Sequence, residues 1–187
     1  DFEAIDQALD TAFQHARNYP PEFDSDTQRE SVTKELLDAM SRLESRLDNS
    51  AEVQPILFRL GKAHTLAFNL DLAGSREKSD KYFAELFKLN PNHAEGHLYY
   101  GQHLSGRGEF KSAIDHLQIA ADGGFDLALK MIGLVYVQMG DKEKARASFE
   151  VFLKKYPGDP QVKLFLDSLN SEGEYELKPM MKKGVIQ

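Results

Sequence analysis

Apolar residues recur at helical spacing along most of the chain, and the stripes they form predict a series of amphipathic helices. Two stripes precede residue 50, on either side of a turn-rich linker at residues 18–26. Their spacings of three and four residues place each set on one helical face. The first stripe contains Phe2, Ile5, Leu9 and Phe13, and the second contains Val32, Leu36, Met40, Leu43 and Leu47. We expect two helices here, packed on the helices that follow or against a second subunit.

The most regular pattern runs from Asp126 to Pro157. Its first helix has an apolar face interrupted by Gly133, which costs about 1 kcal/mol of helix propensity relative to Ala and leaves room for a neighbouring helix. Gly140 and Asp141 then supply a helix stop and an N-cap, so a second helix is predicted to start at Lys142. The residues of the pattern are Leu129, Ile132, Gly133, Tyr136, Ala145, Phe149 and Pro157.

The same spacings recur in two upstream copies. The nearer copy contains His97, Tyr100, Gly101, Leu104, Ala113 and Leu117, and the farther copy contains Leu57, Leu60, Gly61, His64, Phe83 and Pro91. In the farther copy Gly61 precedes Ser79 by 18 positions, where the other copies have 12 between Gly and Ala. We therefore expect a lengthened first helix, over residues 63–72, and a longer turn at residues 73–76.

These spacings resemble the signature of the tetratricopeptide repeat family, W-x2-L-G-x2-Y, then A-x3-F, then Pro, over about residues 53–170. After Pro160, the leucines at 164, 166 and 169 predict one terminal helix, which such an array needs as a cap. The resemblance implies an all-α solenoid of about three helix pairs plus this C-terminal capping helix, with an N-terminal helical extension. An unrelated helical bundle is the alternative, and the repeated spacings argue against it.

Three segments are predicted from these patterns. Residues 1–50 form an acidic two-helix extension, residues 51–170 hold the repeats and their cap, and residues 171–187 form a tail without periodicity. The tail is either a frayed end or linker, or an extended segment lying in a groove of its own or a neighbouring molecule. In the second case the anchors are Tyr175, Leu177 and Met180.

Charge is unevenly distributed and excludes some partners. Residues 1–50 hold 12 acidic and 5 basic side chains, a net charge of −7, whereas residues 51–187 hold 18 of each. This excess repels nucleic acid and anionic membrane surfaces, and the chain lacks the basic stripe that they require. No apolar run is long enough for membrane insertion. The chain starts at Asp1 and not at Met, which slightly favours a processed bacterial protein of the periplasm or cell envelope over a cytoplasmic one.

Catalytic and metal-binding patterns are weak. Cysteine is absent, so thiolate chemistry, disulfides and cysteine-ligated zinc are all excluded. His93 and His97 stand four apart, but Ala94 occupies the position where a zincin has Glu. His97 and His64 stand at packing positions of their repeats, so we assign both to the core. No nucleophile elbow, phosphate loop or dinucleotide fingerprint occurs. We predict no enzymatic activity, no metal and no cofactor.

The family resemblance implies a protein-binding adaptor or scaffold whose first helices line a concave groove. The residues expected to face a peptide or helix of the partner are Phe58, Lys62, Thr65, Leu98, Gln102, Ser105, Leu127, Lys130, Leu134 and Val137. The carboxylate clamp of co-chaperones that bind heat-shock chaperones is missing, because the matching positions hold Phe58, Lys62, Tyr99, Leu127 and Met131. We therefore expect no such function.

Two alternatives stay open. One is a secretion-type chaperone that forms a homodimer through its N-terminal helices, since proteins of that kind resemble this family and share its three repeats and acidic pI. The other is an accessory domain of a larger envelope enzyme or assembly machine. The partner's identity is beyond the sequence, because a fold does not fix a function.

Overall fold

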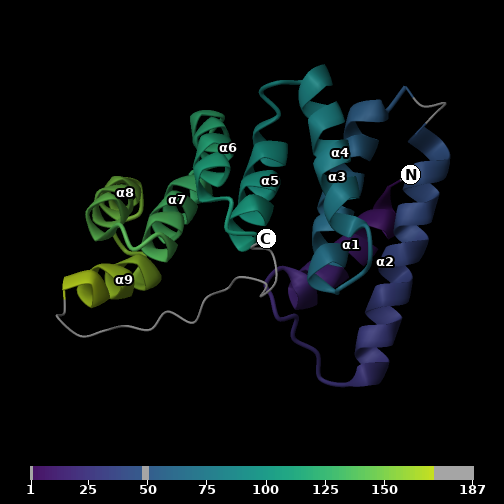
Figure 1. Ribbon diagram of the computed structural model, residues 1–187, viewed down its shortest axis with the longest axis horizontal. Helices are drawn as coiled ribbons and strands as arrows, with labels where there is room; N and C mark the ends of the chain where they lie inside the picture. Colours follow the sequence, from purple (N-terminus) through teal and green to yellow (C-terminus); the bar gives the residue numbers. More distant parts are fainter. Residues whose placement is uncertain (1, 48–50, 171–187) are drawn as a thin grey trace. The chain divides into compact units, whose positions relative to one another are not determined.

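The computed structural model describes residues 2–47 and 51–170, and within these ranges the chain forms nine α-helices (Figure 1). They divide into two compact units, the first ending at Pro91 and the second starting at Asn92. The first unit contains α1 (Glu3–Ala16), α2 (Asp26–Leu47), α3 (Val53–Asn69) and α4 (Ser75–Leu89). The second contains α5 (Ala94–Gly106), α6 (Phe110–Asp122), α7 (Leu127–Gln138), α8 (Lys142–Lys155) and α9 (Pro160–Asn170). The all-α repeat architecture predicted from the sequence is confirmed.

A close approach at Gly61 joins α3 to α4. A Cβ atom at Gly61 would lie 2.9 Å from the ring of Phe83, and that ring is fully buried. α3 has 17 residues, against 13 in α5 and 12 in α7, so the first helix of this pair is lengthened as predicted. The predicted boundaries were wrong by a few residues, because α3 ends at Asn69 and Ser75 already belongs to α4.

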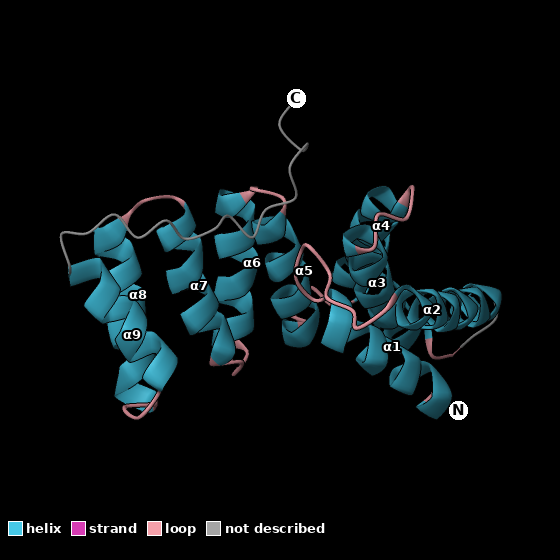
Figure 2. Ribbon diagram, turned by 90° about the horizontal axis from the view of Figure 1, so that it is seen from below, coloured by secondary structure: helices cyan, strands magenta, loops and turns pink. Residues whose placement is uncertain are grey.

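The two N-terminal helices pack as a further helix pair ahead of α3 (Figure 2). α2 contacts α1 and α3, and α1 also contacts α3, in the way that α6 lies against α5 and α7. Ile5, Leu9, Leu36 and Leu43 from the two predicted stripes are at most 4% exposed. The stripes are therefore buried on each other and on the first repeat, so the extension behaves as an additional, longer pair.

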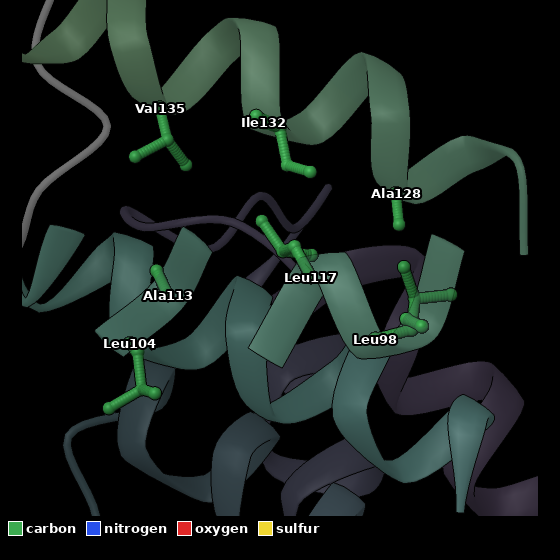
Figure 3. Packing of buried hydrophobic residues seen from close by; sticks show 8 residues of the cluster. Leu98, Leu104, Ala113, Leu117, Ala128, Ile132 and Val135 are labelled. Atoms are coloured by element: carbon green, nitrogen blue, oxygen red, sulfur yellow. The ribbon is translucent and has the colours of Figure 1, made fainter. Parts of the chain in front are cut away.

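In the second unit, two glycines set the distance between paired helices. A Cβ atom at Gly101 would lie 2.7 Å from Leu117, and one at Gly133 would lie 2.4 Å from the Phe149 ring. Leu117 of α6 fills the space between α5 and α7, where it lies near Leu98 and Ile132 (Figure 3). Helices α5, α6 and α7 thus share one apolar core.

A second cluster joins α7 and α8 to the terminal helix. It consists of Ala145, Phe149, Phe152 and Val162, with further side chains of α7 and α9 packed against it. The rings of Phe149 and Phe165 stack with their centroids 5.6 Å apart. This packing gives α9 the capping role predicted for it.

The ends of α8 and α9 follow from local chemistry. Gly140 has a φ of 75°, in the left-handed region that ends a helix, and the Asp141 carboxylate accepts a 3.1 Å bond from the Lys144 N–H. α8 therefore starts at Lys142, as predicted. α9 starts at Pro160, and the Asp159 carboxylate accepts a 2.8 Å bond from the Val162 N–H.

The predicted segments and the compact units divide the chain differently. The boundary at residue 50 separates two parts of the first unit, because α1 and α2 pack on α3. The predicted tail and its anchors Tyr175, Leu177 and Met180 lie outside the described residues. No helix in the described ranges combines the length and hydropathy that crossing a bilayer requires.

Candidate functional site

α7 has one face that its packing against α6 and α8 leaves partly open. Ala128, Ile132 and Val135 are buried in the core shared with α5 and α6, and Gly133 lies on Phe149 of α8. The residues of α7 predicted to contact a partner lie at other positions of the same helix. They are Leu127, Lys130, Leu134 and Val137.

Three of these residues form an apolar strip, which we call the α7 strip: Leu127, Leu134 and Val137. Their spacings of seven and three residues place them on one side of the helix. Leu127 is 53% exposed, and Leu134 and Val137 are half-buried against the α8 and α9 cluster. Leu127 is therefore accessible to a partner at the start of the helix. Leu134 and Val137 extend the apolar surface along the same side of the helix.

Lys130 is held by its own chain. Its Nζ lies 3.2 and 3.5 Å from the two carboxylate oxygens of Asp159 and 5.8 Å from the centroid of the Phe152 ring. Only 13% of its side chain is exposed. The N–H of Val162 and, less strongly, the Lys130 ammonium lower the pKa of Asp159. Lys130 thus fastens α7 to the start of α9.

On α5 the predicted groove residues are mostly buried. Leu98 is 8% exposed and belongs to the core in Figure 3, and Ser105 is 7% exposed. The Ser105 hydroxyl donates a 3.4 Å bond to Oε1 of Gln138. Gln102 is half-buried. The interior positions of Leu98 and Ser105 leave Gln102 as the α5 residue that can contact a partner.

In the first unit, the three predicted residues are engaged within the fold. Lys62 lies 3.2 Å from Asp10 of α1 and 5.5 Å from the centroid of the Phe13 ring. Thr65 is 9% exposed, and its hydroxyl lies 3.1 Å from both the Gly61 carbonyl and the Ser79 hydroxyl. Phe58 is half-buried. Thr65 therefore faces α4.

The contact between α1 and α3 was not predicted from the sequence. Arg59 forms a bidentate ion pair with Asp6, and the Asn69 amide donates a 2.8 Å bond to the carbonyl of Ala16. The Phe2 ring lies beneath the Arg59 and Arg46 guanidinium groups, at 4.1 and 4.4 Å. A signal was available in the sequence, because Asp6 and Asp10 flank the apolar stripe of α1 with helical spacing.

The histidines of α5 and α6 serve the fold. His93 caps α5, since its Nδ1 accepts a 3.0 Å bond from the Gly96 N–H. His97 is 3% exposed, and its Nδ1 lies 2.7 Å from Nδ1 of His116. Burial and next the His97 ring lower the pKa of His116 to about 4, against the opposing carboxylate of Asp115. Within residues 2–47 and 51–170, no three His, Asp or Glu side chains gather as metal ligands.

His64 lies in a polar cluster that joins α2 to the first repeat. Its Nε2 is 3.7 Å from Oε1 of Glu44, which also accepts 3.0 Å bonds from Lys78 and Tyr82. The His64 ring stacks on Tyr82 at 5.4 Å. Burial and next the Lys78 ammonium lower the pKa of His64 to about 4, and Glu44 opposes this shift. The neutral ring therefore behaves as the core aromatic predicted at this position.

Comparisons with known proteins agree with this architecture. A family model described as Tetratricopeptide repeat matches residues 128–159, so the repeat predicted over α7 and α8 is confirmed. Among solved structures, the crystal structure of MamA superposes with a TM-score of 0.63 at 21% identity, covering 79% of this chain and 84% of that chain. No curated protein sequence matches. The likeness to MamA shows the fold.

Proposed function

Because the chain is a helical repeat protein with a tetratricopeptide repeat at residues 128–159, we propose that it binds a segment of another protein on its α7 strip. Repeats of this type generally mediate protein–protein interactions. The observation that carries the proposal is Leu127, a leucine 53% exposed on a helix whose other apolar side chains are buried or half-buried. Together with the half-buried Leu134 and Val137, Leu127 offers a ligand apolar contacts at helical spacing.

The strip and two further predicted contact residues, Gln102 and Lys130, define the partner segment. Leu127, Leu134 and Val137 offer apolar contact, Gln102 offers an amide, and Lys130 is neutralised by Asp159. A partner that presents apolar side chains on one face of a helix, or alternate side chains of an extended peptide, complements this surface. A partner anchored by a carboxylate finds no open cation among these residues. We therefore propose a non-enzymatic adaptor for an amphipathic segment.

The chaperone alternative receives less support. Its dimerisation through the N-terminal helices needs apolar side chains on α1 and α2 that are open to a second subunit. Leu9 and Leu36 of the two predicted stripes are at most 1% exposed, because they pack within their own unit, so a dimer would have to use Leu37, which is 46% exposed on α2 and lies outside the stripes. We therefore propose the adaptor and not a chaperone that dimerises through these stripes.

Site-resolved photo-crosslinking tests the proposal. A photoreactive amino acid replaces Leu127 or Leu134, and in a matched control it replaces Val151, which is 45% exposed on α8. We expect the same partner segment to crosslink from positions 127 and 134 but not from 151. Leu98→Glu is unsuitable as a test, because Leu98 lies in the core. Leu127→Glu keeps the fold and should weaken binding of the captured segment at least tenfold by calorimetry.

Two results would overturn the proposal. The first is equal crosslinking from position 151, which would indicate nonspecific contact. The second is unchanged affinity of Leu127→Glu together with an unchanged circular dichroism spectrum, because the strip would then be intact in fold and irrelevant to binding.

A further inference from the structure

The outer side of α9 carries one open leucine among polar side chains. Leu164 is 61% exposed, the largest exposed fraction among the large apolar side chains given for the described residues. Lys163 and Asp167 beside it are also exposed, whereas Val162 and Phe165 pack towards α8. Terminal elements of helical arrays carry polar outer faces, which keep the array soluble. Leu164 is thus an apolar side chain flanked by two exposed charges of opposite sign.

A groove of complementary character lies between α1 and α2. It has a volume of about 280 Å³, and its floor includes Ala4 and Ala8 of α1 with Ala39 of α2. The small side chains let another helix approach closely. The rim includes Asp38 and Arg42, which are both exposed. A water molecule needs only roughly 10–15 Å³ of such space, so the groove has room for an aliphatic side chain.

The charges on the two surfaces match in spacing and are opposite in sign. On α2, Asp38 precedes Arg42 by four residues, and on α9 Lys163 precedes Asp167 by four residues. One helical turn separates the members of each pair. With the two helices side by side, Lys163 meets Asp38 and Asp167 meets Arg42, while Leu164 enters the groove over Ala8. Long-range charge acts in the same direction, because residues 1–50 carry −7, whereas α8 holds five basic and two acidic residues.

We propose that α9 of one molecule docks in the α1–α2 groove of a second copy of this chain. The two surfaces are different, so the contact is heterologous: in a pair joined by one such contact, one molecule keeps a free groove and the other keeps a free α9 surface. Such a contact joins molecules head to tail, into closed rings or open-ended chains. It leaves the α7 strip unoccupied, and the proposed adaptor function and this self-association stand or fall separately.

Analytical ultracentrifugation of the full chain over a concentration series tests the proposal. We expect the weight-average mass to rise with concentration above that of the monomer, and to fall with added salt because the ion pairs are screened. Leu164→Glu should leave a folded monomer, since this side chain is already largely in water. Val151→Glu, a matched exposed apolar position on α8, should associate like the wild type.

A charge exchange makes the test specific for the proposed pairing. Asp38→Lys and Lys163→Glu should each weaken association about tenfold, and the chain carrying both changes should recover most of it. Glu30→Lys supplies the control, because it makes the same charge change on an exposed position of α2 outside the groove. A double variant no better than either single one would overturn the pairing.

Three further results would overturn the proposal itself. One is a wild-type chain that stays monomeric at every concentration, and another is association that Leu164→Glu leaves unchanged. The third is a full chain that stays monomeric while a chain lacking residues 171–187 associates, which would assign the α9 surface to that segment of the same molecule.

Discussion

The Arg59 guanidinium donates two hydrogen bonds of 2.7 Å to the Asp6 carboxylate, one from Nε and one from Nη2. These residues lie 53 positions apart, and their contact fixes α1 against α3. Planar bidentate pairs of this kind add geometric specificity as well as energy. The Phe2 ring stacks beneath the same guanidinium, so the N-terminal helix is held by charge and by aromatic contact at one point.

Loss of this pair should loosen α1 without unfolding the repeats. Arg59→Lys keeps the charge but removes the fork, and we expect it to cost about 1 kcal/mol, at the upper end for ion pairs that are partly exposed. Urea unfolding measures the loss, and amide hydrogen exchange should accelerate in α1 more than in α7. Glu30→Gln on an exposed part of α2 serves as the control. Uniform acceleration in both helices would contradict this local role.

Gly133 should tolerate no side chain. A methyl group there would lie 2.4 Å from the buried Phe149 ring, so Gly133→Ala forces α7 away from α8. We expect a loss of about 1 to 3 kcal/mol in the free energy of unfolding, despite the better helix propensity of Ala. Gly106 near the end of α5 has open space around it, and Gly106→Ala should be neutral or stabilising. Thermal unfolding of the two variants measures the difference, and equal midpoints for Gly133→Ala and Gly106→Ala would contradict the prediction.

Stability should fall as the medium becomes mildly acidic. The pKa values of His64 and His116 are lowered to about 4 in the fold, whereas an unfolded histidine titrates near 6.5. Their neutral forms are favoured in the native state, so this stability is fully present above about pH 6.5 and is lost as the pH falls towards 4. His64→Phe keeps the stack on Tyr82 and should reduce the pH dependence between these limits. Urea unfolding at several pH values measures this dependence. If the slope of the unfolding free energy against pH is the same in His64→Phe as in the wild type, the buried neutral ring is contradicted.

The hydroxyls of Thr65 and Ser79 should show non-additive effects. Both lie near the Gly61 carbonyl, at 3.1 and 3.3 Å, and 3.1 Å from each other. Thr65→Val leaves Ser79 bonded to the same carbonyl, so we expect a loss of about 1 kcal/mol. Adding Ser79→Ala removes the second hydroxyl, which is the remaining side-chain donor to this carbonyl. A double-mutant cycle should therefore give a coupling energy clearly different from zero, and strict additivity would show that the hydroxyls act independently.

The spacing of apolar residues and glycines predicted the helices well, because it reflects contacts between the two helices of each pair. The positions of Gly61, Gly101 and Gly133 anticipate contacts with residues 16 to 22 positions later, on the next helix. The extra length between Gly61 and Ser79 likewise predicted the longer α3. Such features depend on neighbours in the chain, and periodicity records them directly.

The candidate site was less predictable, because its residues depend on partners far away in the sequence. Lys130 was expected to face a partner, yet Asp159, 29 positions later, neutralises it. Leu98 and Thr65 were expected on the open side, but the exact rotation of each helix places them in the interior. A helical pattern states which residues share a face and does not state which neighbouring helix covers that face.

The contacts between helices in each unit run mainly from one helix to the next along the chain. Segments joined in this way find each other quickly, because little chain entropy is lost on closing short loops. They also separate one pair at a time, since each interface depends only on its immediate neighbours. For α9, where Leu164 is 61% exposed, this predicts that opening starts at α9 and spreads towards α7. The second unit is thus expected to melt from its end as a sequence of steps and to refold in the reverse order.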